Sequence, residues 1–143
     1  MPAAPDDAAF ADHDVLDLFR PLERVCAVAA EGPPGAVAAL SGGSDSLALL
    51  HLLRRWRSAR PAGARPFAIV AVTIDHGLRP EAADEARDAG RLARQWGFEH
   101  VTRRWEGPKP ATGLQEAARE ARYALLSQEA RRHGFATILT GHT

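Results

Sequence analysis

The stretch Ser41-Gly42-Gly43-Ser44-Asp45-Ser46 separates two segments of opposite character. Before it, Ala36 to Leu40 is apolar and predicts a short buried β-strand. After it, Asp45 to Arg57 predicts a helix, because large apolar side chains recur there on one side. These side chains are Leu49, Leu52, Leu53 and Trp56. Two adjacent glycines allow the backbone to turn sharply, so the sequence predicts a strand, a tight turn and a helix in direct succession.

The same alternation of strand and helix patterns continues toward the C-terminus. Further apolar runs lie at Phe67–Ile74, His100–Trp105 and Thr137–Thr140, and helical patterns lie at Pro80–Trp96 and Leu114–Arg132. The apolar runs lack a strict alternation, which indicates strands buried on both faces of a parallel sheet. Strands and helices in this order form βαβ units with right-handed crossovers. We therefore expect a doubly wound parallel α/β sheet of the Rossmann type, as a single domain over residues 36–143.

Residues 1–35 precede this domain. Met1–Asp12 is rich in alanine, proline and aspartate, and we expect it to be a frayed lead-in. Asp14–Ala30 predicts one helix, because apolar residues recur there at helical spacing. These residues are Val15, Leu18, Leu22 and Val25. Prolines and glycines at 31–35 end this helix, and Ser58–Pro66 predicts an exposed loop for the same reason.

The glycine turn also carries the strongest chemical signal in the chain. Unpaired amide groups at the start of the following helix point toward the turn, and the helix dipole favours an anion there. The hydroxyl groups of Ser41, Ser44 and Ser46 can add hydrogen-bond donors. A carboxylate beside a phosphate is unfavourable unless a cation lies between them, so Asp45 indicates a Mg²⁺ ligand. The alternative is a polar turn in which Ser44 or Asp45 caps the helix and no ligand binds.

A second motif, Asp75-His76-Gly77-Leu78-Arg79-Pro80, follows the second predicted strand. Ligands of open α/β sheets bind outside the carboxyl ends of the strands. His76 and Arg79 would therefore bring a polar and a cationic group to the edge where the glycine turn lies. The alternative is a solvated loop that ends in the N-terminal proline of the next helix.

A third motif runs from Gly113 to Tyr123 at the start of the last predicted helix. At 100° per residue, Gln115, Arg119 and Arg122 cluster beside an apolar stripe. Planar hydrogen-bonding groups in this arrangement can converge on one ligand, and the arginine fork suits a phosphate or a carboxylate. The alternative is a solvated helix face with weak surface ion pairs.

Composition excludes several classes of protein. The chain has 18 basic and 18 acidic residues, and this zero balance argues against a free-standing nucleic-acid clamp. Cys26 is the only cysteine, so neither an internal disulfide nor a Cys-x-x-Cys pair is possible. We expect no membrane span and a cytoplasmic location, because the sequence lacks a long apolar run and a secretory signal. It also lacks the Lys-Ser/Thr ending of kinase-type phosphate loops and the Gly-x-Gly-x-x-Gly dinucleotide fingerprint.

Ser-Gly-Gly-x-Asp-Ser after a buried strand resembles the PP-loop of the ATP-pyrophosphatase superfamily. Members of that superfamily cleave ATP between the α- and β-phosphates and adenylate a carbonyl or amide oxygen. They hold the departing pyrophosphate in this loop and use Mg²⁺. The resemblance implies that ATP and Mg²⁺ are the cofactors of this chain.

The three motifs together resemble those of the tRNA(Ile)-lysidine synthetases, and the similarity runs from about Ala36 to the end of the chain. In that family ATP activates the C2 oxygen of the wobble cytidine of an isoleucine tRNA, and free lysine then displaces AMP. The resemblance implies a catalytic set in which Asp45 serves the metal, and Arg119 is favoured over Arg122 as the catalytic arginine. The nucleotide-binding set that it implies is Ser41, Gly42, Gly43, Ser44, Asp45, Ser46, His76 and Arg79.

The sequence departs from that family at its end. The family usually continues into two acidic residues and Gln-x-Glu, whereas this chain ends at Gly141-His142-Thr143. The resemblance therefore implies a domain incomplete at its C-terminus, without the tRNA-binding domains, that binds ATP weakly and does not modify tRNA unaided. Two other interpretations stay open. One is another PP-loop enzyme, such as a tRNA thiolase or an amide-forming synthetase, and the other is a nucleotide-binding module without chemistry.

Overall fold

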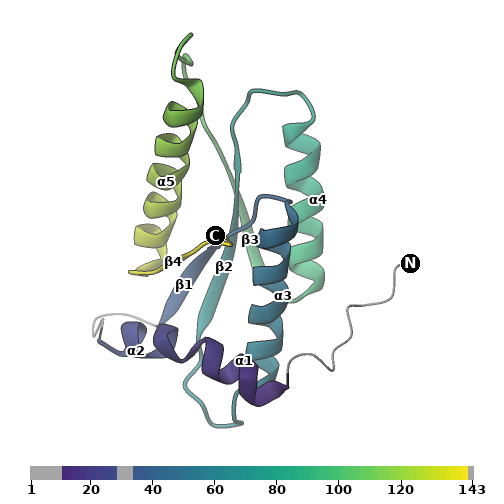
Figure 1. Cartoon of the computed structure of the whole chain (residues 1–143), viewed down its shortest axis with the longest axis vertical. Helices are drawn as coiled ribbons and strands as arrows, with labels where there is room; N and C mark the ends of the chain where they lie inside the picture. Colours follow the sequence, from purple (N-terminus) through teal and green to yellow (C-terminus); the bar gives the residue numbers. More distant parts are fainter. Residues whose placement is uncertain (1–10, 29–33, 142–143) are drawn as a thin grey trace.

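The computed structural model describes residues 11–28 and 34–141, in which helices and strands alternate along most of the chain (Figure 1). The N-terminal residues before 11 and the final His142 and Thr143 lie outside the described part. The elements are α1 (Asp12–Leu18), α2 (Arg20–Val28), β1 (Gly35–Ala39), α3 (Ser44–Ala59), β2 (Ala68–Asp75), α4 (Ala82–Gln95), β3 (Glu99–Arg104), α5 (Leu114–His133) and β4 (Ile138–Leu139).

The described strands form one parallel sheet of four strands in the order β3-β2-β1-β4. The chain builds outward from β1 to β2 and β3, and then returns to place β4 on the other side of β1. The order of the strands therefore reverses between β1 and β4. In open α/β sheets the ligand crevice lies at such a reversal, outside the carboxyl ends of the strands.

Both faces of the sheet are covered, as the unbroken apolar runs predicted (Figure 1). Along β1, Ala36 and Ala38 belong to the core shared with α3 and α4, whereas Val37 belongs to the core shared with α5. Along β2, Ile69 faces the first core and Val70 faces the second. Successive side chains of a strand point to opposite faces, so each strand contributes to both cores. The doubly wound parallel fold is confirmed.

The prediction of a single helix over residues 14–30 is wrong in one respect: the chain bends at Phe19 and forms two helices. Phe19 is buried, and its ring centroid lies 5.5 Å from that of Trp56 on α3. The bend therefore packs Phe19 against α3. It also interrupts the predicted apolar stripe, so that Leu18 and Val25 are half-exposed. The end of the predicted helix, residues 29–30, lies outside the described residues.

The other predicted elements are present with small shifts at their ends. Helix α3 continues to Ala59, into the segment that the sequence assigned to a loop, and Arg60 is its C-cap residue. Helix α5 is followed by Gly134, as a helix-stopping glycine predicts. In the part of the chain that the structure describes, no helix has both the length and the apolar character needed to cross a membrane.

Gly90 lies in the middle of α4 because His100 on β3 occupies the space that a side chain would need. A Cβ atom at Gly90 would lie 2.7 Å from Nδ1 of His100. The ring is held in place by Thr73, whose Oγ1 lies 2.8 Å from Nε2 of His100. Burial and the neighbouring Arg94 lower the pKa of His100, so the neutral ring that packs here is also the form present at neutral pH.

We predict that Gly90→Ala lowers the free energy of unfolding by about 1–3 kcal/mol, because the His100 ring must shift. An ordinary glycine in a helix would give the opposite sign, a gain of up to about 1 kcal/mol. Urea denaturation of Gly90→Ala, His100→Ala and the double variant measures this. In the His100→Ala background, Gly90→Ala should stabilise the protein. Destabilisation of equal size in both backgrounds would contradict the explanation.

Candidate active site

The turn after β1 is held together by the hydroxyl groups of two serines. Ser46 is buried, and its Oγ accepts a hydrogen bond of 3.0 Å from the Ser41 amide and donates one of 3.1 Å to the Gly43 carbonyl. Since that hydroxyl has one proton, Ser41 Oγ is the donor in the 3.0 Å contact between the two hydroxyls. The Ser46 hydroxyl therefore shapes the turn and has no proton left for a ligand.

Gly42 makes the turn possible, because its φ of 84° is one that residues with a side chain rarely adopt. Gly43 is then the N-cap residue of α3, and no side chain caps the helix. The alternative in which Ser44 or Asp45 serves as the cap is therefore wrong. Ser44 and Asp45 are both exposed, and the uncapped first turn of α3 presents amide groups and the positive end of its dipole.

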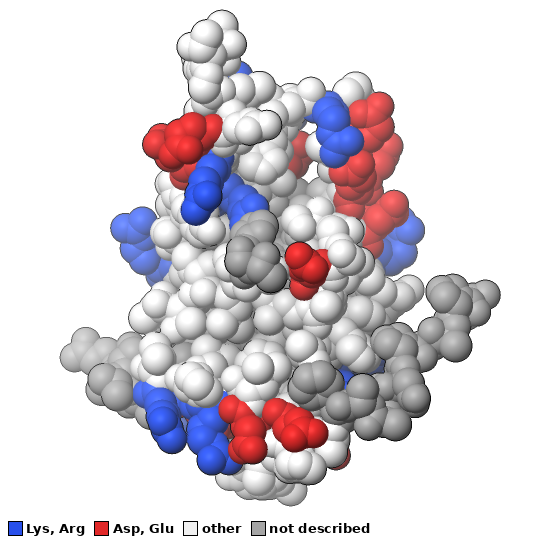
Figure 2. All heavy atoms as spheres, viewed as in Figure 1, with Lys and Arg blue, Asp and Glu red and all other residues white. Residues whose placement is uncertain are grey.

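A cavity of about 350 Å³ opens beside this turn and brings the three sequence motifs together. The turn contributes all of its residues except Gly42, the second motif contributes His76 and Arg79, and the third contributes Arg122. Apolar side chains of β2 and α5 also line it, namely Val72, Ile74 and Leu126. Charged side chains of both signs gather over the upper parts of α5 and α4 (Figure 2). The cavity thus combines an apolar surface, an uncapped helix start and two arginines.

Gly42 lines a neighbouring cavity of about 490 Å³, on the side of the turn that faces α4. Ser41, Gly43 and Glu85 line both cavities. The turn is therefore open to solvent on two sides, and its backbone can be approached from either.

The two arginines of the third motif have different positions. Arg122 is half-buried and lines the cavity, whereas Arg119 is exposed and is not among the lining residues. The guanidinium carbon of Arg119 lies 5.8 Å from the centre of the Tyr123 ring. Of these two arginines, only Arg122 lies on the wall of this cavity, although the sequence favoured Arg119 as the catalytic arginine.

His76 lies between Arg122 and the segment that follows β3. Burial lowers the pKa of His76, and the positive charge of Arg122 lowers it further, while Asp75 opposes both. Its ring meets that of Trp105 edge-on at 6.3 Å, and its Nδ1 atom is buried without a hydrogen-bond partner. His76 is therefore neutral at pH 7, and it brings an unpartnered ring nitrogen to the wall of the cavity.

Comparison with known proteins matches residues 16–143 to the PP-loop domain family. The chain belongs to the PP-loop domain family. The match includes the turn at residues 41–46, so the resemblance drawn from that stretch is confirmed. ATP use is a property of this family, and the uncapped helix start beside the PP-loop cavity suits its triphosphate.

Curated relatives with the name tRNA(Ile)-lysidine synthase are similar to most of this PP-loop chain. The protein from Bradyrhizobium diazoefficiens is 54% identical over 110 residues, which is 77% of this chain and 30% of that protein. The protein from Rhodopseudomonas palustris is 53% identical over 110 residues, again 77% of this chain and 31% of that protein. The chain thus spans less than a third of the length of these relatives. The resemblance to the lysidine synthetases is confirmed at this level.

Two solved structures share the fold. The U34-tRNA thiolase NcsA from Methanococcus maripaludis, solved with its [4Fe-4S] cluster, matches with a TM-score of 0.66 and 14% identity, over 94% of this chain and 48% of that one. NAD+ synthetase from Burkholderia pseudomallei matches with a TM-score of 0.58 and 18% identity, over 94% of this chain and 64% of that one. At these identities the likeness concerns the fold of the PP-loop domain alone.

Sequence reasoning missed the role of Gly141 in the PP-loop site. A Cβ atom at Gly141 would lie 2.6 Å from the carbonyl oxygen of Asp45, so only glycine allows the chain after β4 to pass this close to α3. Gly141 thereby forms part of the cavity wall at the reversal of the strand order. A glycine directly after a predicted strand could have indicated this close approach of the backbone.

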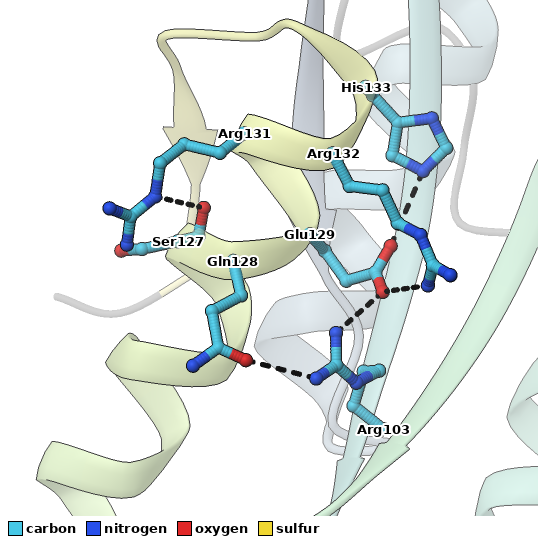
Figure 3. A network of polar contacts seen from close by, with 7 residues as sticks. All are labelled: Arg103, Ser127, Gln128, Glu129, Arg131, Arg132 and His133. Carbon is cyan, nitrogen blue, oxygen red and sulfur yellow. Dashed lines mark hydrogen bonds and ion pairs between the residues drawn. The ribbon is translucent and has the colours of Figure 1, made fainter.

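Sequence reasoning also missed a buried carboxylate on α5, which lies within a network of polar contacts (Figure 3). Glu129 is completely buried, and its Oε1 accepts hydrogen bonds of 2.7 Å from Arg103 on β3 and 3.3 Å from Arg132. Its Oε2 lies 3.3 Å from Nε2 of His133. Burial raises the pKa of Glu129, but the hydrogen bonds from Arg103 and Arg132 outweigh it, so the pKa lies below its usual value. This network fastens α5 to the edge strand of the sheet.

We predict that Glu129→Gln lowers the free energy of unfolding by about 1–3 kcal/mol near pH 7. Because folding lowers the pKa of Glu129, the ionised carboxylate stabilises the protein at pH values above its usual pKa of 4.5. This contribution is lost as the pH falls from 4.5 through the lower pKa of the folded protein. The difference in the free energy of unfolding between wild type and Glu129→Gln should therefore become smaller as the pH is lowered. Urea denaturation at pH 7, 5 and 3.5 measures it. A difference that stays constant with pH would contradict this assignment.

Proposed function

We propose that this chain is the ATP-binding and adenylating part of a tRNA(Ile)-lysidine synthetase. The observation that carries the proposal is the single cavity in which the PP-loop, His76, Arg79 and Arg122 meet. The similarity to lysidine synthases over about three quarters of the chain supports this reaction over others of the PP-loop family. In the proposed reaction the C2 oxygen of the wobble cytidine attacks the α-phosphate of ATP and pyrophosphate leaves. The amino group of free lysine then displaces AMP and forms lysidine.

Each part of the cavity has a proposed role. The amide groups of the PP-loop and of the first turn of α3 bind the phosphates, and Val72, Ile74 and Leu126 offer an apolar surface for the adenine ring. Arg122 stabilises negative charge on the α-phosphate as the cytidine adds, since charge develops there in the transition state. Arg79 neutralises the phosphates near the PP-loop. Arg119, exposed outside the cavity, is left to contact the substrate RNA.

The donor set fits Mg²⁺. Asp45 lines the cavity next to the phosphate-binding amides, and Mg²⁺ in nucleotide sites is held by one or two carboxylates together with phosphate oxygens. Within residues 11–28 and 34–141, no cluster of three or more metal-binding side chains is present, so the phosphates must supply part of the coordination. When bound, Mg²⁺ would neutralise phosphate charge and so make the departure of pyrophosphate easier.

The same cavity could serve two other reactions. Sulfur transfer of the kind that paired cysteines perform is disfavoured, because Cys26 is the only cysteine of this chain. Amide formation is disfavoured, because curated relatives that are 50% and 54% identical to this chain carry the lysidine synthase name. A nucleotide-binding module without chemistry would bind ATP but release no AMP.

We further propose that the isoleucine tRNA is bound mainly by parts beyond this chain and that the chain alone does not complete the reaction. We also propose that the reaction takes place in the cytoplasm.

A chimaera tests the reaction directly. In the Bradyrhizobium diazoefficiens relative, the aligned segment is replaced by the corresponding residues of this chain, and the product is incubated with ATP, lysine and isoleucine tRNA. AMP and lysidine should form together. Arg122→Ala should reduce the rate by about 100-fold or more, as for loss of a group that stabilises transition-state charge, and Arg119→Ala should mainly raise the KM for tRNA. AMP formation that requires ammonia or a sulfur donor in place of lysine would refute the proposal.

Asp45→Asn should abolish the Mg²⁺ dependence of ATP binding by the chain, because the cation loses its protein ligand. Isothermal titration with ATP, at 0 and at several millimolar Mg²⁺, measures this dependence. Asp12→Asn is the matched control, because Asp12 is exposed at the start of α1 and lines neither cavity beside the PP-loop. If Asp45→Asn binds ATP with unchanged affinity and unchanged Mg²⁺ dependence, Asp45 is not the metal ligand.

A further inference from the structure

Glu85 occupies a position between the two cavities that flank the PP-loop. It lies in the first turn of α4, and with Ser41 and Gly43 it lines both cavities. A carboxylate this close to a phosphate site repels the ligand unless a cation accompanies it. An acidic side chain in the first turn stabilises a helix, but this does not account for a carboxylate at the PP-loop.

The partner of Glu85 is Arg79, which lines the first cavity. Oε2 of Glu85 lies 2.9 Å from Nη2 of Arg79. This hydrogen bond uses one N–H group of Nη2, and a guanidinium has five N–H donors. The other nitrogen atoms of Arg79 can therefore donate to a phosphate while the contact with Glu85 is kept. Both side chains are more than half exposed, so the pair contributes little to stability by itself.

The other acidic residues of α4 that form ion pairs do so differently. Asp84 pairs with Arg87 and Asp88 pairs with Arg91, each three residues further along the same helix. Glu85 instead contacts Arg79, which lies outside α4 in the loop between β2 and α4. A contact within a helix leaves the rest of the chain unconstrained, whereas this contact limits where a long side chain on a loop can go.

We propose that Glu85 is a positioning residue, which holds the guanidinium of Arg79 at the PP-loop where the β- and γ-phosphates of a nucleoside triphosphate bind. The proposal rests on the proposed function, because it takes the cavity to be the ATP site. Glu85 removes much of the conformational freedom of Arg79 before the nucleotide arrives, so less entropy is lost on binding. The charge of Arg79 also screens the phosphates from the Glu85 carboxylate.

The first test compares ATP with AMP, because AMP lacks the phosphates that Arg79 would meet. Isothermal titration with Mg·ATP and with AMP is carried out on the chain and on Glu85→Gln. We expect Glu85→Gln to weaken ATP binding by about three- to fivefold, the size of an exposed ion pair, and to leave AMP binding unchanged. Asp84→Asn is the matched control. It removes one negative charge and one arginine contact from the same turn of α4 but lines neither cavity, so both affinities should stay the same.

The second test asks whether Glu85 acts through Arg79. In an Arg79→Ala background, Glu85→Gln should no longer weaken ATP binding, and Glu85→Asp alone should retain part of the wild-type affinity. Three results would each overturn the proposal. In the first, Glu85→Gln binds ATP as tightly as the wild type or more tightly. In the second, it loses as much affinity for AMP as for ATP. In the third, it loses as much affinity for ATP in the Arg79→Ala background as in the wild type. Failure of the unaltered chain to bind ATP would overturn the proposed function and this inference with it.

Discussion

The edge of the sheet where the cavity lies depends on the turn from Ser41 to Ser46, which leads from β1 into α3. The backbone must reverse at Gly42 with a φ of 84°, and the buried hydroxyl of Ser46 must bond back to Ser41 and Gly43. These contacts use the polar groups of the turn internally and leave the start of α3 without a side-chain cap. A helix that begins in this way directs its unpaired amides at whatever lies beyond the strand ends. The other parts of the cavity are arranged around this source of positive potential.

The sheet brings those parts together because its strands are parallel and its order reverses beside β1. The segments that follow β1, β2 and β4 all emerge at the same edge. The turn, His76 with Arg79, and Gly141 therefore meet although they are separated by up to a hundred residues in the chain. Helix α5 crosses the opposite face and adds Arg122, and the buried Glu129 fixes this helix to β3 further down. A buried carboxylate of this kind adds little stability in comparison with apolar side chains of the same volume, although removal of one partner is costly, and it restricts how the helix can rotate or slide.

Two carboxylates, Asp45 and Glu85, and two arginines, Arg79 and Arg122, line the cavity, so their charges balance. Arg79 has Glu85 as a partner, and the positive charge of Arg122 helps to keep the nearby His76 neutral. Asp45 adds a carboxylate beside the amides of α3. Such a site has little net charge when empty, and it can bind a highly charged nucleotide together with its cation without leaving an uncompensated charge in the structure.

The order of residues along the chain was enough to predict the helices and strands of this protein and the position of its phosphate-binding turn. Strands buried on both faces, helices of regular period and a glycine pair between them are short-range signals, and each was read from neighbouring residues. Tertiary structure decided which side chains share a cavity. Arg119 and Arg122 are three residues apart on one helix, and only the rotation of α5 against the sheet determines that Arg122 lines the cavity. The contacts of Glu85 with Arg79 and of Gly141 with Asp45 depend in the same way on segments that only packing brings together.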